Sequence, residues 1–337
     1  MLYLSACECG SVPYWTSVSL EGGGIIAGVT VLAPPHQSHD VHPFEARVNG
    51  VRLCGWSAGP SHGPLVLLLH GFPEYCFGWR HQLPALAAAG FHVLAPDLRG
   101  YNRSDKPRRV CDYRVETLAA DVVGLIDHAG RRSAAVVGHD WGGIIAWYTA
   151  MLFPERLNRL AVLNAPHPAA YLRELRRGWS QRLRSWYVLF FQIPWLPEAA
   201  LRWNDYAIPR RFFREGPARV SAAPAADVDR YVRALAEPGA LTAMVNYYRA
   251  TFRQAPSELS QFVRPISMPT LVLWGDRDRY LVRELADGLE PWVSNVRVEH
   301  LPKATHWVQH DEPAQVSEQL VAFLKPLSGQ RSVAQTG

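Results

Sequence analysis

Short apolar runs alternate with helix-periodic stretches over residues 64–163, and this alternation constrains the fold more than any other feature of the chain. The run from Pro64 to Leu69 is continuously apolar, which is typical of a parallel strand buried on both faces. Strand–helix alternation with right-handed crossovers predicts a doubly wound, mostly parallel α/β sheet, preceded by a hairpin that turns at Asn49-Gly50. Further strands are expected over residues 91–95, 133–137, 160–163, 269–274 and 296–300, and helices over 79–89, 115–129, 141–153 and 313–324.

The alternation is interrupted between Leu163 and Pro269, and this gap is too long to be a loop inside a compact domain. Helical periodicity over residues 199–203, 227–235 and 239–254 predicts an all-helical cap inserted between two core strands. The expected organisation is an extension outside the fold over residues 1–40, a first core segment over 41–168, the cap over 169–260, a second core segment over 261–326 and a tail over 327–337.

The chain has 337 residues, of which 48% are hydrophobic and 19% charged, so it is not a disordered chain, a coiled coil or a collagen-like repeat. Its net charge of +5 is distributed unevenly along the chain. Residues 1–46 carry four acids and no Lys or Arg, whereas residues 170–260 carry fourteen Arg and eight acids. No Lys/Arg run exceeds two residues, so we expect no nucleic-acid partner. The basic cap could attract acidic substrates or a membrane surface, but we prefer a solvated helical face and expect no membrane association.

The five cysteines are odd in number and lack the spacing of a metal site, which favours a reduced, cytoplasmic setting without a bound metal. The longest apolar stretch is shorter than the about 20 residues that a bilayer span needs. The N-terminus lacks the basic region of a signal peptide.

A sharp strand–turn–helix elbow is expected at residues 138–142, which read Gly-His-Asp-Trp-Gly. This spacing exposes the central side chain, Asp140, at the carboxyl end of the sheet, where open α/β sheets bind ligands. A carboxylate that attacks a saturated carbon forms an ester that water can hydrolyse, whereas a serine would form an ether. Asp140 therefore indicates displacement at a saturated carbon followed by ester hydrolysis, although an Asp here could also simply cap the helix.

An acid and then a histidine are expected after the nucleophile, because that is their chain order in this architecture. His306 follows the strand at 296–300 and can activate water, with a carboxylate to orient its imidazole. Asp276 and Asp278 both follow the strand at 269–274, and spacing alone does not choose between them. The other loop histidines, His139 and His167, are expected to pack or hydrogen-bond, and His310, which precedes the last helix, is expected to be exposed.

Hydrolysis of an ester also needs donors for the oxyanion. The loop after the first core strand supplies one backbone N–H and the residue after the nucleophile supplies the other, so the candidates are Phe72 and Trp141. The sequence leaves the isomer of the bond before Pro73 open.

Together these motifs resemble the α/β-hydrolase-fold epoxide hydrolases over about residues 42–326. The matching segments are His70–Glu74, Asp97–Ser104, Gly138–Gly143, Trp274–Asp278 and His306–Trp307. The resemblance implies the α/β-hydrolase fold and favours Asp278 over Asp276 as the triad acid. One departure is Asn102, where the family usually has Gly; because Asn tolerates left-handed dihedrals, we expect the turn to survive.

The resemblance also implies two cap tyrosines that bind and protonate the epoxide oxygen. Residues 186–194 are similar to the segment that holds the first, at Tyr187, and residues 246–249 to the segment that holds the second, at Tyr248. Two phenol O–H groups can stabilise the alkoxide left by ring opening. The alternative for either tyrosine is ordinary packing with a hydrogen-bonded tip.

The resulting expectation is an epoxide hydrolase that converts an epoxide and water to a vicinal diol through an alkyl ester on Asp140, with no cofactor. A haloalkane or haloacid dehalogenase with the same triad is one alternative, in which Trp141 and Asn164 would bind halide. A non-catalytic ligand receptor is another, and the intact set of Asp140, Asp278 and His306 argues against it. We expect a small-molecule epoxide as the ligand and a monomer or homodimer.

Overall fold

The computed structural model describes residues 41–218, 222 and 224–325. The expected extension over residues 1–40 and the tail over 327–337 lie outside the described residues. Within them, eight strands form one sheet in the order β1-β2-β4-β3-β5-β6-β7-β8. The strands are β1 (Val41–Val48), β2 (Val51–Ala58), β3 (Leu65–Leu69), β4 (His92–Pro96), β5 (Ala134–His139), β6 (Leu157–Leu163), β7 (Thr270–Gly275) and β8 (Val296–Leu301).

The predicted hairpin and the predicted parallel sheet are both confirmed. β1 and β2 pair antiparallel around Asn49 and Gly50, whose positive φ angles of 45° and 75° suit a tight two-residue turn. β2 is antiparallel to β4, and the pairings from β4 to β8 are parallel. Every residue of β3, β5 and β7 is buried, which explains why their sequences are continuously apolar.

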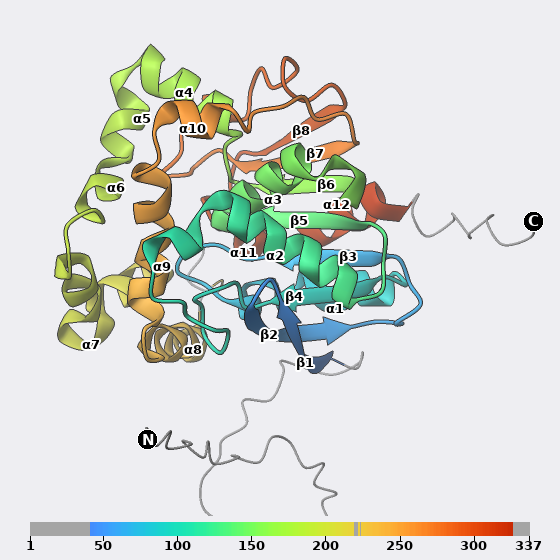
Figure 1. Ribbon diagram of the computed structural model, residues 1–337, viewed down its shortest axis with the longest axis horizontal. Coiled ribbons are helices and arrows are strands. Elements are labelled where there is room, and N and C mark those ends of the chain that lie inside the picture. Colours follow the sequence, from blue (N-terminus) through green and yellow to red (C-terminus); the bar gives the residue numbers. More distant parts are fainter. Residues whose placement is uncertain (1–40, 219–221, 223, 326–337) are drawn as a thin grey trace, which may run out of the picture. The chain divides into compact units, whose positions relative to one another are not determined.

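Helices cover both faces of this sheet (Figure 1). α2 (Val115–His128) packs on α3 (Trp141–Leu152), and α1 (Gln82–Ala88) packs on α12 (Pro313–Leu324). A short helix, α11 (Val308–Asp311), precedes α12. The expected helix over residues 79–89 is shorter than predicted, because residues 76–79 form a separate 3-10 turn before α1 begins.

Seven helices lie between β6 and β7 in the described part of the chain (Figure 1). They are α4 (Pro168–Arg177), α5 (Trp179–Arg184), α6 (Trp186–Phe190), α7 (Leu196–Glu215), α8 (Ala225–Ala236), α9 (Ala240–Phe252) and α10 (Pro256–Ser260). The sequence indicated α8, α9 and the first part of α7; the latter is kinked, with positive φ from Asn204 to Tyr206. It did not indicate α5 and α6, which have six and five residues, too few for a period to be read. No helix among the described residues is long and apolar enough to cross a membrane.

The strand order places two loops side by side at the carboxyl edge of the sheet. From β3 the chain builds outward to β4 on one side, and from β5 to β8 on the other, so β3 and β5 flank a topological switch point. The loop after β3 contains Phe72, and the residue after β5 is Asp140. Beside them, Asn102 keeps its turn with φ of +40° and donates a hydrogen bond from Nδ2 to Asp97 Oδ2 (2.8 Å).

Candidate active site

Asp140 lies in a strained elbow between β5 and α3. Its φ of +50° and ψ of −119° are unfavourable for a residue with a side chain and occur at this kind of nucleophile turn. The elbow closes only because its glycines lack side chains: a Cβ on Gly142 would lie 2.1 Å from the carbonyl oxygen of Leu69, and one on Gly138 would lie 2.3 Å from that of Gly142. The local sequence therefore forces the Asp140 carboxylate out at the sheet edge.

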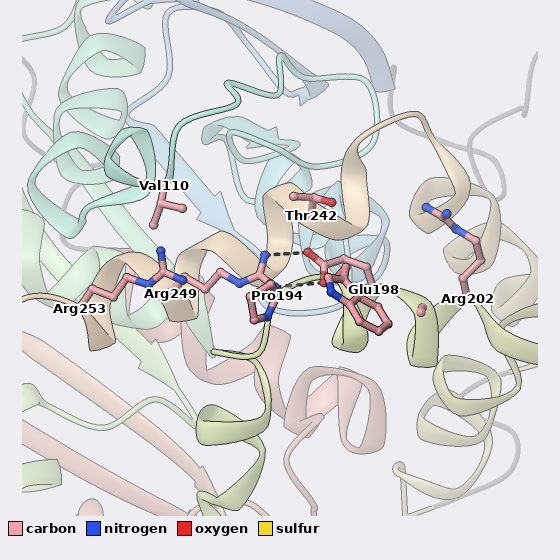
Figure 2. A pocket seen from close by; sticks show the side chains of 9 residues that line it. Val110, Pro194, Glu198, Arg202, Thr242, Arg249 and Arg253 are labelled. Carbon is pink, nitrogen blue, oxygen red and sulfur yellow. Dashed lines mark hydrogen bonds and ion pairs between the residues drawn. The ribbon is translucent and has the colours of Figure 1, made fainter.

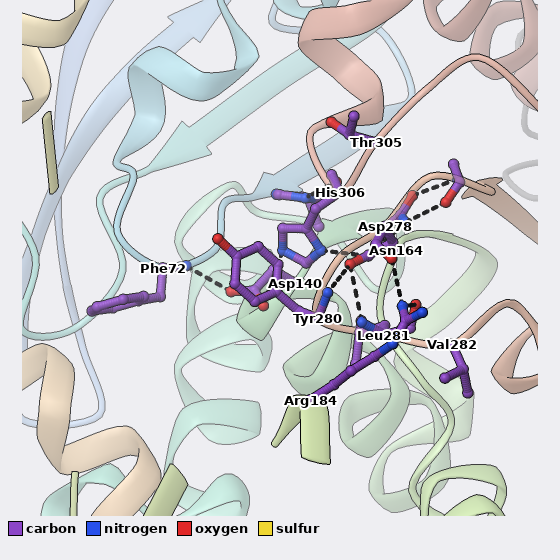
Figure 3. A network of polar contacts seen from close by, with 12 residues as sticks. Phe72, Asp140, Asn164, Arg184, Asp278, Tyr280, Leu281, Val282, Thr305 and His306 are labelled. Carbon is purple, nitrogen blue, oxygen red and sulfur yellow. Dashed lines mark hydrogen bonds and ion pairs between the residues drawn. The ribbon is translucent and has the colours of Figure 1, made fainter. Parts of the chain in front are cut away.

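The two oxygens of Asp140 have different neighbours (Figure 3). Oδ1 accepts a hydrogen bond from the backbone N–H of Phe72 at 2.7 Å. Oδ2 lies 3.5 Å from Nε2 of His306. Trp141 begins α3, where first-turn amides have no partner within the helix, and its N–H stays a prediction as the second oxyanion donor. The bond between Phe72 and Pro73 is cis.

His306 is paired with Asp278 and not with Asp276. Nδ1 of His306 lies 2.7 Å from Oδ2 of Asp278 (Figure 3). Asp276 instead contacts Nδ1 of His300 at 2.6 Å, near the surface. The structure thus brings Asp140, His306 and Asp278 into one line, and it separates the two carboxylates that spacing alone could not distinguish.

The charge of the imidazole is set by the two carboxylates beside it. Burial alone would lower the pKa of His306, but the charge of Asp278 and hydrogen bonds with Asp140 and Asp278 raise it to about 10. Burial alone would raise the pKa of Asp278, but the charge of His306 and several hydrogen bonds hold it below its ordinary value of 3.8. At neutral pH the resting site therefore holds an imidazolium between two carboxylates.

These shifts define the pH range over which the pair stabilises the fold. The pKa of His306 is raised above 6.5, so its contribution is complete below about pH 6.5 and is lost as the pH rises towards 10. The pKa of Asp278 is lowered, so its contribution is present above about pH 3.8 and is lost as the pH falls through the folded-state value. Both contributions are complete only between these two limits.

Tyr187 on α6 and Tyr248 on α9 meet above the elbow. Their ring centroids are 5.9 Å apart, and Tyr248 packs edge-on against Trp141 at 5.0 Å. Burial raises the pKa of both phenols well above the usual range, and the nearby charge of Asp140 adds to this. Both hydroxyls therefore stay protonated and can donate hydrogen bonds beside the carboxylate.

Comparisons with known proteins agree with this geometry. The sequence model of the alpha/beta hydrolase fold family matches residues 64–313. The AB hydrolase superfamily protein YfhM of Bacillus subtilis is 41% identical over 279 residues, covering 82% of this chain and 96% of that protein. Epoxide hydrolase 4 of Homo sapiens is 36% identical over 282 residues, covering 82% of this chain and 76% of that protein. A crystal structure of Bacillus megaterium epoxide hydrolase in complex with an inhibitor matches with a TM-score of 0.76 and 32% identity, covering 84% of this chain and 100% of that one.

The chain belongs to the epoxide hydrolases of the α/β-hydrolase family. This family assignment confirms the resemblance seen in the sequence. Among the described residues of this epoxide hydrolase, no group of three or more His, Cys, Asp and Glu side chains is arranged to hold a metal ion.

Two further residues of this epoxide hydrolase contact Asp278 or His306. Asn164, after β6, donates from Nδ2 to Asp278 Oδ2 (2.9 Å) and accepts the backbone N–H of Gly275 on Oδ1 (2.8 Å). The ring of Tyr280 lies 5.4 Å from that of His306, and its backbone N–H donates to Asp278 (2.7 Å). The sequence indicates Asn164 only as a candidate halide ligand and gives no signal for Tyr280, because both contacts join residues whose proximity depends on the folded sheet.

A buried polar cluster lies behind His306. Glu74 is fully buried and accepts hydrogen bonds from Tyr231 (3.0 Å) and Gln309 (3.1 Å). Nε2 of His310 also contacts the Glu74 carboxylate, at 2.5 Å from Oε1. The expectation that His310 is exposed is wrong, because α11 turns it inward onto Glu74.

His139 links this cluster to the triad. Its Nδ1 lies 3.3 Å from Glu74, and its Nε2–H donates to the backbone carbonyl of His306 at 2.9 Å. The ring is completely buried, so the expected hydrogen-bonding role of His139 agrees with its position. The cluster holds the main chain that carries the triad histidine.

Asp140→Asn is expected to lower the pKa of His306 from about 10, because one of its two adjacent carboxylates loses its charge. NMR titration of the His306 imidazole measures the change. Asp276→Asn is the matched control, since that carboxylate contacts His300, and it should leave the pKa of His306 in place. An unchanged pKa in Asp140→Asn would show that the two side chains are not coupled.

Proposed function

We propose that this epoxide hydrolase opens its substrate by forming an alkyl ester on Asp140 and then hydrolyses that ester with a water activated by His306. The observation that carries the proposal is the carboxylate at the elbow, with Oδ1 held by the Phe72 amide at 2.7 Å and Oδ2 3.5 Å from His306. Asp278 orients the imidazole through its 2.7 Å contact with Nδ1. No step requires a redox cofactor.

In the first step, Oδ2 of Asp140 attacks an epoxide carbon, and the bond between that carbon and the ring oxygen breaks. Oδ1 already occupies the place where the ester carbonyl oxygen will lie, which leaves Oδ2 to react. The phenols of Tyr187 and Tyr248 hold the ring oxygen, and one of them transfers its proton to the alkoxide as it forms. Both phenols remain protonated until then, because burial and Asp140 raise the pKa of each.

The first step prepares the second through electrostatics. Esterification removes the charge of Asp140, which is one of the causes of the raised pKa of His306. The imidazolium can then lose its proton, to the phenolate or to solvent, and become a base. Neutral His306 takes a proton from water as the water attacks Cγ of the ester.

The tetrahedral intermediate carries its negative charge on Oδ1, where the amides of Phe72 and Trp141 stabilise it. When the intermediate collapses, the diol oxygen leaves with the proton held by His306, and Asp140 regains its charge. The products are a vicinal diol and the starting enzyme.

The surroundings of Asp140 support an apolar, aryl-bearing epoxide as substrate. Phe72 and Phe191 lie edge-on to Tyr248, with ring centroids at 5.5 and 4.8 Å. A mutant of the Bacillus megaterium enzyme has been solved with its product (R)-3-[1]naphthyloxy-propane-1,2-diol, and that enzyme is 32% identical to this chain with a TM-score of 0.75. A fused aryl group on the substrate would suit the aromatic side chains found here.

The structure offers less to a dehalogenase. That reaction needs N–H donors for halide, and the side-chain amide of Asn164 is already bound to Asp278 and to the carbonyl of Gly275. We further propose residues 169–260 as the cap of the site, a cytoplasmic setting and a monomer or homodimer. Analytical ultracentrifugation of the full chain distinguishes a monomer from a homodimer.

Purified protein is expected to release diol from aryl, terpene and fatty-acid epoxides, with the aryl compounds turned over best. It should release no halide from a chloroalkane or fluoroacetate. Chromatography of the diol and a halide-selective electrode measure the two activities. Halide release without diol formation would contradict the proposed reaction and favour the dehalogenase.

A further inference from the structure

The cap presents an unusual concentration of exposed apolar side chains. Ten large apolar side chains of the described residues are exposed, and all except Phe252 lie within residues 179–208. Four of them are tryptophans: Trp179, Trp186, Trp195 and Trp203, each 64–74% exposed. Tryptophan is usually largely buried, so this segment, here called the tryptophan band, is a marked departure from an ordinary solvated surface.

The tryptophan band spans α5, α6 and the first part of α7, which follow one another along the outer side of the cap (Figure 1). On α6, Trp186 is exposed while the next residue, Tyr187, is half-buried with its ring 5.9 Å from that of Tyr248. The band is therefore one residue away from a proposed proton donor of the active site.

The exposed charges between residues 175 and 208 are mostly positive. Arg176, Arg177, Arg182 and Arg202 are exposed. The guanidinium of Arg182 lies over the ring of Trp179, 5.2 Å from its centroid. Of the two carboxylates in this segment, Glu198 is buried and paired with Arg249, and Asp205 is exposed and paired with Arg210 at 3.0 Å.

An open pocket of about 620 Å³ adjoins the band, lined by Trp195, Glu198, Arg202, Arg249 and Arg253 among others. Figure 2 shows Arg202 and Arg253 on opposite sides of the paired Glu198 and Arg249. Glu198 neutralises Arg249 through contacts at 2.7 and 3.1 Å. Within the described part of the chain the guanidinium groups of Arg202 and Arg253 form no ion pair or hydrogen bond, so the pocket has a net positive charge.

Contrary to the expectation from the sequence, we propose that the tryptophan band docks this protein on an anionic lipid surface, with a lipid phosphate in the pocket between Arg202 and Arg253. Tryptophan is favoured at membrane–water interfaces because its ring is apolar and its N–H is polar. Arginines beside exposed aromatic residues add attraction to anionic headgroups and bind phosphate well.

The charge pattern disfavours a second copy of the chain as the occupant. A two-fold interface places the same surface on both sides, so the exposed arginines of one copy would face those of the other, and the one exposed carboxylate of the band, Asp205, is already paired with Arg210. A small free anion would fill the pocket but would leave the tryptophans exposed. A lipid surface satisfies both features.

Docking goes beyond the proposed reaction and does not depend on it. With the proposed reaction, contact with a lipid surface would bring the site close to its substrate, because apolar epoxides concentrate in membranes and α6 connects the docked surface to Tyr187. Failure of docking would leave the chemistry at Asp140 untouched.

Co-sedimentation of the full chain with vesicles tests the proposal. The protein should bind vesicles that contain phosphatidylglycerol and stay in solution with pure phosphatidylcholine. Trp179→Ser with Trp195→Ser, and separately Arg202→Gln with Arg253→Gln, should each weaken binding by at least about 10-fold. Arg103→Gln with Arg132→Gln, which removes two exposed arginines outside the cap, is the matched control and should bind like the unchanged protein.

Each variant is also assayed for its thermal midpoint and its hydrolysis of a water-soluble epoxide, both of which should stay unchanged because the altered side chains are exposed. Vesicles that contain phosphatidylglycerol should protect the tryptophan fluorescence from an aqueous quencher. Glycerol phosphate alone should give no such protection. Equal sedimentation with both vesicle types, or unaltered binding by the two cap variants, would overturn the proposal. The proposal would also be overturned if the unchanged protein had the mass of two chains in solution and the variant with Trp179→Ser and Trp195→Ser had the mass of one. That result would assign the tryptophan band to a dimer interface.

Discussion

His306→Gln is expected to stop turnover while leaving the first chemical step able to proceed. Asp140 can still attack the epoxide, but no base remains to activate water against the ester. We expect kcat to fall by roughly 10⁴-fold, and the protein mass to rise by the mass of one epoxide molecule as the ester accumulates. Intact-protein mass spectrometry after incubation with substrate measures the adduct.

The matched control for this variant is His300→Gln. His300 is also paired with an aspartate, at 2.6 Å from Asp276, but it lies near the surface and away from Asp140. This variant should keep the activity of the unchanged protein and form no lasting adduct. If His306→Gln retained normal turnover, the base would have to be another residue.

Replacing Tyr187 and Tyr248 together with Phe is expected to slow ring opening by roughly 10²- to 10⁴-fold, since each phenol is a donor to the developing alkoxide. Phe keeps the ring packing between the two residues, which lie 5.9 Å apart, so the fold should persist. The effect falls on the first step, and rapid-quench measurement of ester formation should show no early burst of adduct.

Tyr247→Phe is the matched control, because Tyr247 lies next to Tyr248 on α9. The hydroxyl of Tyr247 donates to the backbone carbonyl of Arg99 at 2.6 Å and does not point towards Asp140. Its loss should cost about 1 kcal/mol in the free energy of unfolding and leave kcat nearly unchanged. Equal losses of kcat in Tyr247→Phe and in the double variant would remove the case for two dedicated proton donors.

The parts of the fold that could be predicted from the sequence are those in which local pattern and burial agree. β3, β5 and β7 are buried on both faces, so their sequences are continuously apolar and were recognisable. The elbow was recognisable because only glycine fits at Gly138 and Gly142, where a Cβ would collide with backbone.

Other features depend on contacts that no local pattern records. Asp276 and Asp278 are two residues apart, and only the position of β8 decides that His306 meets one and His300 the other. His310 is buried because α11 faces Glu74, a residue more than two hundred positions away in the chain. The exposure of the four tryptophans of the tryptophan band was equally hidden, since a tryptophan is ordinarily expected to be packed.

The proposed reaction depends on a covalent ester on Asp140 that water then hydrolyses at its carbonyl carbon. A single turnover in water enriched in oxygen-18, with enzyme in excess over epoxide, tests it most directly. We expect the label to enter the carboxylate of Asp140, where mass spectrometry of the peptide that contains this residue detects it, and we expect the first diol formed to carry none. Label in that first diol, with none in Asp140, would show that water attacks the epoxide directly and would contradict the account.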